Sequence, residues 1–291
     1  MQVLFVAPTI NATAVQAAEE AGEWLRLIGI ASELVDADEL LIGSLALREV
    51  STRVESGDFG LICALGGDGT VLKATRIATR ATLPLLGVNF GSLGFLTGAR
   101  PQSLQAALQA FLAGTLAEDR RVMLEATIRF ADESTAVYQA LNEIVLGRSN
   151  MGRDINIDLA INGNTLPQLR ADGVIVATAT GSTAYALSAG GPLLTPGHEG
   201  LCVVPISAHS LGVATFVSAP EDVIELAPRP RPGQRAVINI DGQPLSSKDA
   251  DKEIHSVEVG KAANELVLLS FDAPDFYVKI ARSLSGGGDA T

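Results

Sequence analysis

Apolar runs and amphipathic stretches alternate along the N-terminal part of the chain. Short apolar runs bounded by turn residues predict buried strands, and apolar residues spaced three and four apart predict helices between them. Strands that alternate with helices favour right-handed βαβ units on a parallel sheet, so we expect an α/β domain here. The predicted strands are 3–7, 30–35, 60–65 and 84–88, and the predicted helices are 13–28, 72–79 and 103–112, with Asn11 and Ser103 as the expected caps.

The pattern changes near Arg121, where short apolar runs follow one another and helical periodicity almost disappears. Many short strands at such spacing favour a sandwich-like all-β domain. We therefore expect an α/β domain over residues 1–118 and a β-sandwich domain over 119–264, followed by a strand at 265–271 and a helix at 276–284. The predicted strands of the second domain are 122–130, 136–146, 155–161, 173–177, 201–206, 223–226, 236–240 and 253–259.

Composition narrows the classes of partner. The 291 residues carry a formal net charge of −12 and only 4% aromatic residues, which disfavours nucleic acid because phosphate backbones would be repelled and bases would find few stacking partners. No run approaches the roughly 18 apolar residues of a membrane span, and no secretory signal is visible, so we expect a cytoplasmic protein. Cys63 and Cys202 lie in apolar runs, where we expect buried, reduced thiols. With 29 glycines, an acidic chain of this kind would bind anions mainly through backbone N–H groups.

The strongest local motif is Gly66-Gly67-Asp68-Gly69-Thr70. It follows a predicted buried strand and precedes a predicted helix, which places it at the carboxyl edge of the sheet, where α/β proteins bind ligands. Glycines there let the backbone approach a phosphate at the helix N-terminus. Asp68 would repel a phosphate, but it could serve as a general base for an attacking hydroxyl. The alternative is an ordinary tight turn with Asp68 as the helix N-cap.

Three further segments carry candidate chemistry. The turn 89–96 contains two glycines after the next strand, and its alternative interpretation is a plain strand-to-helix turn. The segment 171–192 places a strand before a turn rich in glycine and hydroxyl groups, which suits the polar groups of a nucleotide, and Tyr185 could stack on a ring. The alternative, and the more frequent case for such a turn taken alone, is that its hydroxyl groups serve only the local structure. Asn142 and Glu143 interrupt an apolar run, where polar side chains need partners unless they face outward at an edge.

Several familiar templates are missing from the sequence. No G-x-x-x-x-G-K-[ST] motif occurs, which excludes a P-loop protein. The three histidines show no metal-ligand spacing with the two cysteines. No local arrangement favours a Ser-His-Asp or Cys-His nucleophile.

Taken together and in this order, these segments resemble the NAD kinases over most of the chain. The resemblance rests on the turns 66–70 and 89–96, on Asn142-Glu143, on the block 172–192, and on 241–243 and 276–277. Lipid kinases and phosphofructokinases share the GGDGT turn alone, whereas its combination with the block 181–192 is specific. The sequence departs from the family pattern at Ala179, where proline is common, and at 212–215, which lack the usual Arg-Pro.

The resemblance implies transfer of the γ-phosphoryl group of ATP to the adenosine 2′-hydroxyl of NAD, with Mg²⁺ bridging the donor phosphates. It implies that Asp68 acts as the base and that the C-terminal segment 265–291 packs back on the first domain. It also implies a homodimer or homotetramer, in which some contacts to NAD come from a neighbouring subunit. The residues expected at the NAD site are Asp68, Gly69, Lys73, Asn142, Glu143, Arg153, Arg170, Asp172, Thr183, Ala184, Tyr185, Ser188, Ser207 and Gln243, and those expected at the phosphates are Gly66, Gly67, Gly69 and Thr70.

Two other functions are compatible with parts of the pattern. A lipid kinase would share the GGDGT turn, but a net charge of −12 opposes docking on anionic lipid. A dinucleotide-binding regulator without catalysis would not need Asp68. The sequence leaves open whether polyphosphate replaces ATP and whether NADH is accepted.

Overall fold

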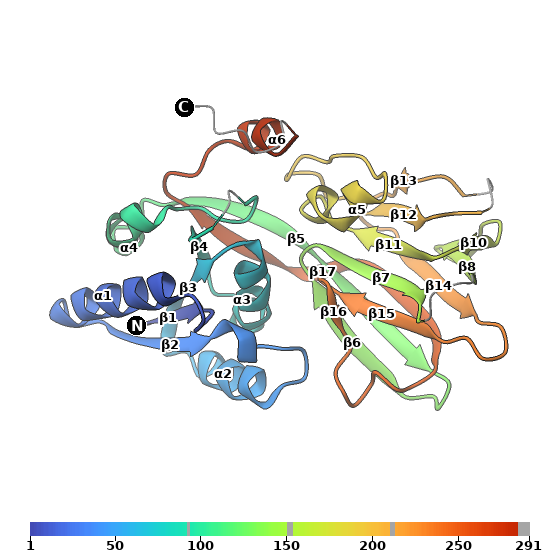
Figure 1. Cartoon of the computed structure of the whole chain (residues 1–291), viewed down its shortest axis with the longest axis horizontal. Helices are drawn as coiled ribbons and strands as arrows, with labels where there is room; N and C mark the ends of the chain where they lie inside the picture. The colour runs from blue at the N-terminus through green and yellow to red at the C-terminus, as the bar shows by residue number, and fades with distance from the viewer. Residues whose placement is uncertain (92–93, 150–153, 210–212, 285–291) are drawn as a thin grey trace. The chain divides into compact units, whose positions relative to one another are not determined.

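The computed structural model describes residues 1–91, 94–149, 154–209 and 213–284 (Figure 1). The chain divides into two compact units: the first comprises Met1–Arg120 and the chain from Leu266 onward, and the second comprises Arg121–Glu265. The first unit is therefore built from two separate stretches of sequence.

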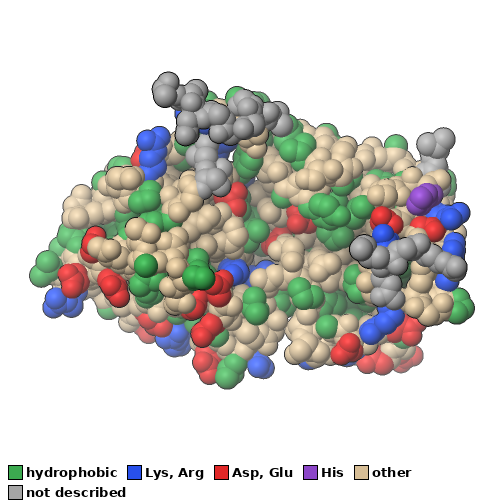
Figure 2. All heavy atoms as spheres, in the orientation of Figure 1, with side chains coloured by type: hydrophobic (Ala, Val, Ile, Leu, Met, Phe, Trp, Pro, Cys, Tyr) green, Lys and Arg blue, Asp and Glu red, His purple; other side chains and the backbone are tan. Residues whose placement is uncertain are grey.

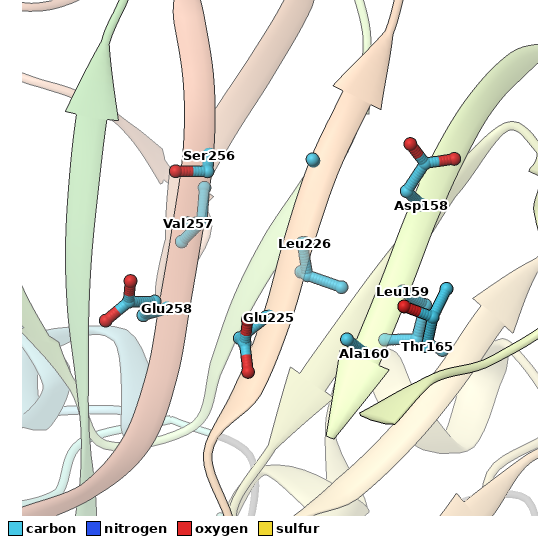
Figure 3. A pocket seen from close by; sticks show the side chains of 10 residues that line it. Asp158, Leu159, Ala160, Thr165, Glu225, Leu226, Ser256, Val257 and Glu258 are labelled. Atoms are coloured by element: carbon cyan, nitrogen blue, oxygen red, sulfur yellow. The ribbon is translucent and has the colours of Figure 1, made fainter. Parts of the chain in front are cut away.

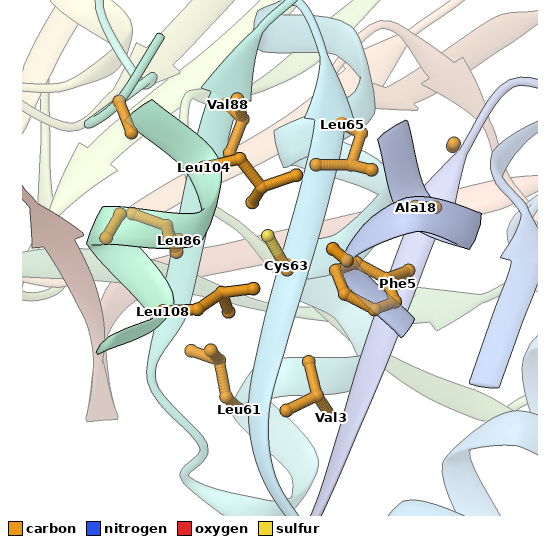
Figure 4. Packing of buried hydrophobic residues seen from close by; sticks show 14 of the residues in the cluster. Val3, Phe5, Ala18, Leu61, Cys63, Leu65, Leu86, Val88, Leu104 and Leu108 are labelled. Carbon is orange, nitrogen blue, oxygen red and sulfur yellow. The ribbon is translucent and has the colours of Figure 1, made fainter. Parts of the chain in front are cut away.

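A parallel sheet forms the centre of the first unit, and its strands lie in the order β17-β4-β3-β1-β2. β3 is apolar throughout because both of its faces are covered, as in other parallel sheets. Leu61, Cys63 and Leu65 point to the face covered by α1 and α4 (Figure 4), and α3 packs on β3 from the other side. The strands are β1 (Gln2–Ala7), β2 (Ala31–Asp36), β3 (Phe59–Gly66), β4 (Leu85–Asn89) and the end of β17 (Ile254–Ser270), and the helices are α1 (Ala12–Leu27), α2 (Leu45–Glu55), α3 (Asp68–Ala81), α4 (Leu104–Leu112) and α6 (Phe276–Leu284), with the short 3-10 helices η1 (Ala37–Glu39) and η2 (Pro101–Ser103).

The second unit consists of mostly antiparallel strands. One sheet has the order β13-β12-β11-β7-β15-β16, and the other strands of the unit pair as β10-β8-β14 with the first part of β17, together with β5, β6 and β9. A short 3-10 helix, η3 (Gly181–Thr183), and one turn of helix, α5 (Tyr185–Ser188), follow β11. The strands are β5 (Ala117–Phe130), β6 (Thr135–Ala140), β7 (Glu143–Arg148), β8 (Ile155–Ile161), β9 (Asn164–Thr165), β10 (Leu169–Ala171), β11 (Gly173–Ala177), β12 (Cys202–Ile206), β13 (Phe216–Val217), β14 (Ile224–Arg229), β15 (Ala236–Ile240) and β16 (Gln243–Pro244).

The α/β and β organisation is confirmed, but several predicted elements were wrong in detail. The run 136–146 is not one strand, because the chain leaves β6 at Ala140 and re-enters a sheet in β7 at Glu143. The runs 253–259 and 265–271 belong to one strand, β17, which continues through the polar residues between them. Ser103 occupies the N-cap position of α4 but makes no side-chain cap bond, because its hydroxyl oxygen lies 3.0 Å from the Arg100 carbonyl oxygen and 2.9 Å from the Asp272 Oδ2 instead. Asn11 does cap α1, through a bond from the Ala14 N–H.

Charged side chains of both signs lie on the surface. Asp and Glu side chains are scattered over the face shown in Figure 2 and are mixed with Lys and Arg. Within the described ranges, no helix combines the length and the apolar character that crossing a membrane requires. Cys63 and Cys202 are both buried and unpaired with each other, and burial raises the pKa of each thiol.

Candidate active site

The GGDGT turn joins β3 to α3 as the sequence predicts. Gly66 ends β3, Gly67 is the N-cap of α3 in an extended conformation, and Asp68 is the first helical residue. A Cβ atom on Gly66 would lie 2.8 Å from the Thr70 Cβ, whereas one on Gly67 or Gly69 would meet nothing within 4 Å. Because the first N–H groups of a helix have no partners inside it, this open N-terminus is suited to binding an anion.

The Asp68 carboxylate is fixed by the turn that follows β4. Oδ2 accepts a hydrogen bond of 2.8 Å from the Phe95 N–H, and Oδ1 accepts one of 3.0 Å from the Leu96 N–H. Gly94 packs directly against this carboxylate, since a Cβ there would lie 2.6 Å from the Asp68 Cγ. The alternative of Asp68 as an N-cap is therefore wrong, because Gly67 occupies that position and makes no side-chain cap.

The turn 89–96 holds this carboxylate rather than leading directly into a helix. The next helical residues begin only at Pro101, in η2. Ser92 and Leu93 of this turn lie outside the described residues. The first unit thus brings Asp68 and the turn 89–96 together, although α3 and β4 separate them in the sequence.

Lys73, one turn further along α3, forms an ion pair with Asp38 of η1. Its Nζ lies 2.6 Å from the Asp38 Oδ1, and 22% of the Lys73 side chain is exposed. The lysine is thus close to the surface and held by a carboxylate that a phosphate group could replace.

In the second unit, Asn142 and Glu143 lie at the break between β6 and β7. Only 8% of Asn142 and 5% of Glu143 is exposed, so the alternative of an outward-facing edge position is wrong. The Glu143 Oε2 has no hydrogen-bond partner within the described part of the chain. Burial, with the nearby Asp241 carboxylate adding to it, raises the pKa of Glu143 to about 8. A buried carboxyl oxygen without a partner is typical of a site that a ligand completes.

Asp241 holds this break in place. Its carboxylate accepts hydrogen bonds from three successive backbone N–H groups, those of Leu141 at 2.9 Å, Asn142 at 2.7 Å and Glu143 at 3.1 Å. Asp241 is 9% exposed and has a positive φ of 47° in the turn between β15 and β16. Gln243, a predicted NAD contact, begins β16 directly after this turn.

The hydroxyl groups of the turn 178–183 bond within the protein. Thr178 Oγ1 donates to the Leu141 carbonyl at 2.6 Å and accepts from the Gly181 N–H at 3.1 Å. Ser182 Oγ donates to the Ala179 carbonyl at 2.6 Å, and a Cβ on Gly181 would lie 2.8 Å from the Asn142 Cα. These hydroxyls therefore build the turn against Asn142, which agrees with the structural alternative for this segment.

Thr180 of the same turn accepts a hydrogen bond from a buried arginine. The Arg121 Nη1 lies 3.2 Å from the Thr180 Oγ1, and Arg121 is 7% exposed. Sequence reasoning missed this arginine, and the available signal was its place directly before the predicted strand 122–130.

Three of the remaining predicted NAD contacts form a second group. Arg170 pairs with Asp154, and Asp172 lies 2.7 Å from the Arg148 Nε, a bond that lowers the pKa of Asp172. Asp172 precedes β11 whereas Thr178 follows it, so at about 3.3 Å per residue the two ends are roughly 20 Å apart. The structure thus does not bring this group to Asn142 and Glu143. This group consists of Arg170, Asp172 and Ser207. Thr183, Ala184, Tyr185 and Ser188 lie with η3 and α5 after β11. Arg153 lies outside the described residues.

A shallow pocket of about 150 Å³ lies on the outer side of β8, β14 and β17 in the second unit. Glu225 and Glu258 face each other on neighbouring strands there, and Asp158 lines the pocket from β8 (Figure 3). None of the predicted site residues lines it, and its carboxylates would repel phosphate. Across the described ranges, no three or more His, Cys, Asp and Glu residues are grouped so that they could hold a metal ion.

The fold and these sites define an α/β nucleotide-binding protein with a second, β-rich unit. Residues 3–116 match the family model of the ATP-NAD kinase N-terminal domain, and residues 141–269 match that of the ATP-NAD kinase C-terminal domain. The chain is 32% identical to the NAD kinase of Citrifermentans bemidjiense over 94% of both chains. It is 37% identical to the NAD kinase of Azoarcus sp. over 88% of this chain and 83% of that one.

Two solved structures share the architecture. An NAD kinase from Archaeoglobus fulgidus in complex with ATP superposes with a TM-score of 0.72 at 26% identity, over 97% of this chain and 99% of that one. Yeast NADH kinase complexed with NADH superposes with a TM-score of 0.82 at 21% identity, over 100% of this chain and 89% of that one, a similarity that concerns the fold.

The chain belongs to the NAD kinase family. It is accordingly a phosphotransferase of a family that phosphorylates NAD to NADP, as the resemblance predicted. The match of both domain models favours this function over a lipid kinase.

Proposed function

We propose that the protein transfers the γ-phosphoryl group of ATP to the adenosine 2′-hydroxyl of NAD, and that Asp68 is the base for this transfer. The observation that carries the proposal is the position of the Asp68 carboxylate. Two backbone N–H groups fix it at the N-terminus of α3, next to the open Gly67 and Gly69. A phosphate and a hydroxyl-activating carboxylate can therefore occupy the same edge of the sheet.

In the proposed reaction, the 2′-O–H bond breaks and its proton passes to the Asp68 carboxylate. The 2′-oxygen forms a bond to the γ-phosphorus while the bond to the β-phosphate oxygen breaks, and ADP leaves. The N-terminus of α3 and the residues Gly66, Gly67, Gly69 and Thr70 would hold phosphate oxygens, with Lys73 exchanging Asp38 for a phosphate. Phosphoryl transfer depends mostly on such positioning and charge neutralisation.

Mg²⁺ enters this scheme as part of the substrate MgATP. Magnesium prefers phosphate and water oxygens with few protein carboxylates. The described residues supply one suitable carboxylate at the GGDGT turn, that of Asp68, which already accepts two N–H groups. We therefore propose that the ATP phosphates bind the ion, rather than a set of protein ligands.

For the dinucleotide, we propose that Asn142 and Glu143 bind polar groups of NAD, with Thr183, Ala184, Tyr185, Ser188 and Gln243 around them. The buried, unpartnered Glu143 Oε2 supports this role. The residues Arg170, Asp172 and Ser207, together with Arg153, would then contact NAD held by a neighbouring subunit, because Asp172 and Thr178 lie at opposite ends of β11. This arrangement requires a homodimer or homotetramer, which light scattering would detect.

The test is an assay of NADP formation from ATP, Mg²⁺ and NAD, with the wild type and the variant Asp68→Asn. We expect the variant to lose about 10²–10⁴-fold in kcat, the range of general-base catalysis. An amide has one acceptor oxygen, so one of the two N–H groups loses its partner, at a cost of roughly 1–3 kcal/mol in stability.

Asp132→Asn is the matched control, since the Asp132 carboxylate also accepts a backbone N–H, that of Ser134 at 3.0 Å. Wild-type turnover in Asp68→Asn would overturn the assignment of the base. NAD binding without any NADP formation by the wild type would instead favour the regulator.

A further inference from the structure

The turn that holds Asp68 is itself held by the C-terminal segment of the chain. The Phe271 N–H donates to the Gly98 carbonyl at 2.8 Å, and a Cβ on Gly98 would lie 3.0 Å from the carbonyl carbon of Leu269. The ring of Phe276 in α6 lies 6.2 Å from that of Phe95. All these residues belong to the first unit, so the segment 94–98 lies between α3 and the end of the chain.

Lys279 of α6 makes the most specific of these contacts. Its Nζ donates hydrogen bonds of 3.0 Å to the carbonyls of Phe95 and Thr97, and only 8% of the residue is exposed. Burying an ammonium group is costly, so such a lysine is retained only where its hydrogen bonds compensate for the lost hydration. Neither the sequence motifs nor the proposed reaction explains it.

The two contacts meet in a single peptide group. The Phe95 carbonyl that accepts from Lys279 and the Leu96 N–H that donates to Asp68 Oδ1 belong to the same peptide bond. A cation on the carbonyl side polarises the group and strengthens the hydrogen bond that its N–H donates. The ammonium of Lys279 is thereby linked to the carboxylate of Asp68 through one rigid peptide.

We propose that Lys279 is a positioning residue for Asp68, acting through the Phe95–Leu96 peptide. This inference rests on the proposed function, because it concerns the carboxylate assigned as the base. Lys279 fixes the orientation of that peptide and hence of the carboxylate toward the 2′-hydroxyl. It takes no part in the proton transfer itself.

The test compares Lys279→Met, Lys279→Gln and Lys279→Arg with the wild type in the assay of NADP formation. We expect Lys279→Met to lower kcat at least tenfold with both KM values changed less than about threefold. Lys279→Arg keeps donors for both carbonyls and should restore kcat to within about threefold of the wild type. Lys261→Met is the control, since the Lys261 ammonium pairs with Glu199 in the other unit.

Two measurements separate positioning from general stability. Hydrogen exchange of the Phe95 and Leu96 amides should accelerate in Lys279→Met without ligand, while β1 and β3 amides exchange as before. In an Asp68→Asn background, Lys279→Met should lower kcat no further, because the group that it positions is already gone. If Lys279→Met does not fold, Lys279→Gln, which keeps a neutral donor group without the charge, takes its place in both measurements.

An unchanged kcat in Lys279→Met, or an equal loss with and without Asp68, would overturn the proposal. Neither result would touch the proposed function, whose own failure would be the absence of NADP formation by the wild type.

Discussion

Replacing Glu143 by Gln tests whether the Glu143 carboxyl group, at the break between β6 and β7, is protonated and therefore neutral in the folded protein. The Glu143 pKa is raised from 4.5 to about 8 by burial and by Asp241. Below pH 4.5 the carboxyl is protonated in both the folded and the unfolded chain. As the pH rises from there to about 8, only the unfolded chain releases the proton, so the wild type loses stability; above pH 8 the loss is complete.

The size of the effect follows from the shift. One pKa unit corresponds to about 1.4 kcal/mol, so a shift from 4.5 to about 8 means that ionising Glu143 costs at most roughly 5 kcal/mol of stability at high pH. Glutamine cannot ionise. The free energy of unfolding of Glu143→Gln should therefore rise relative to the wild type by up to this amount between pH 5 and pH 9, on top of a constant offset from the amide.

Urea unfolding of both proteins at several pH values measures this difference. Glu258→Gln is the control, because Glu258 is an exposed carboxylate on β17 (Figure 3). A stability difference between Glu143→Gln and the wild type that stays the same from pH 5 to pH 9 would refute the reasoning, since Glu143 would then be ionised in the folded protein.

Two further substitutions test the packing of the site. Gly94→Ala would place a Cβ against the fixed Asp68 carboxylate and should lower kcat at least tenfold. The kcat of Gly91→Ala, whose Cβ would meet nothing within 4 Å, should stay close to that of the wild type. Equal activities of the two variants would contradict the contact between Gly94 and Asp68. Thr178→Val removes the hydrogen bonds of a buried hydroxyl to Leu141, Asn142 and Gly181 and should cost roughly 2–3 kcal/mol in urea unfolding. It should also raise the KM for NAD through the displaced Asn142, and an unchanged KM would separate Thr178 from the NAD site.

The parts of the site that follow from sequence are those set by local pattern. Gly66 to Thr70 could be predicted because a buried strand, a glycine turn and a helix follow one another directly. The break at Asn142 was visible as a polar interruption of an apolar run. Helix α2 was missed although Leu47, Val50 and Val54 have helical spacing, because charged residues between them lower the mean hydropathy of the stretch.

The rest depends on contacts between residues distant in sequence. Asp241 binds N–H groups about 100 positions away, and Lys279 binds carbonyls more than 180 positions away. The motif 241–243 includes Asp241, but no local pattern shows which groups either side chain contacts. Only the folded chain shows that one orients Asn142 and Glu143 and the other contacts the turn that holds Asp68.

The discontinuity of the first unit has a consequence during protein synthesis. The strand edge of β4 stays uncovered until Leu268 and Leu269 of β17 emerge from the ribosome, after the whole second unit has been made. An uncovered strand edge invites pairing with other chains. The nascent protein must therefore shield or tolerate this edge through most of translation, and the Asp68 carboxylate reaches its final surroundings only when α6 is released.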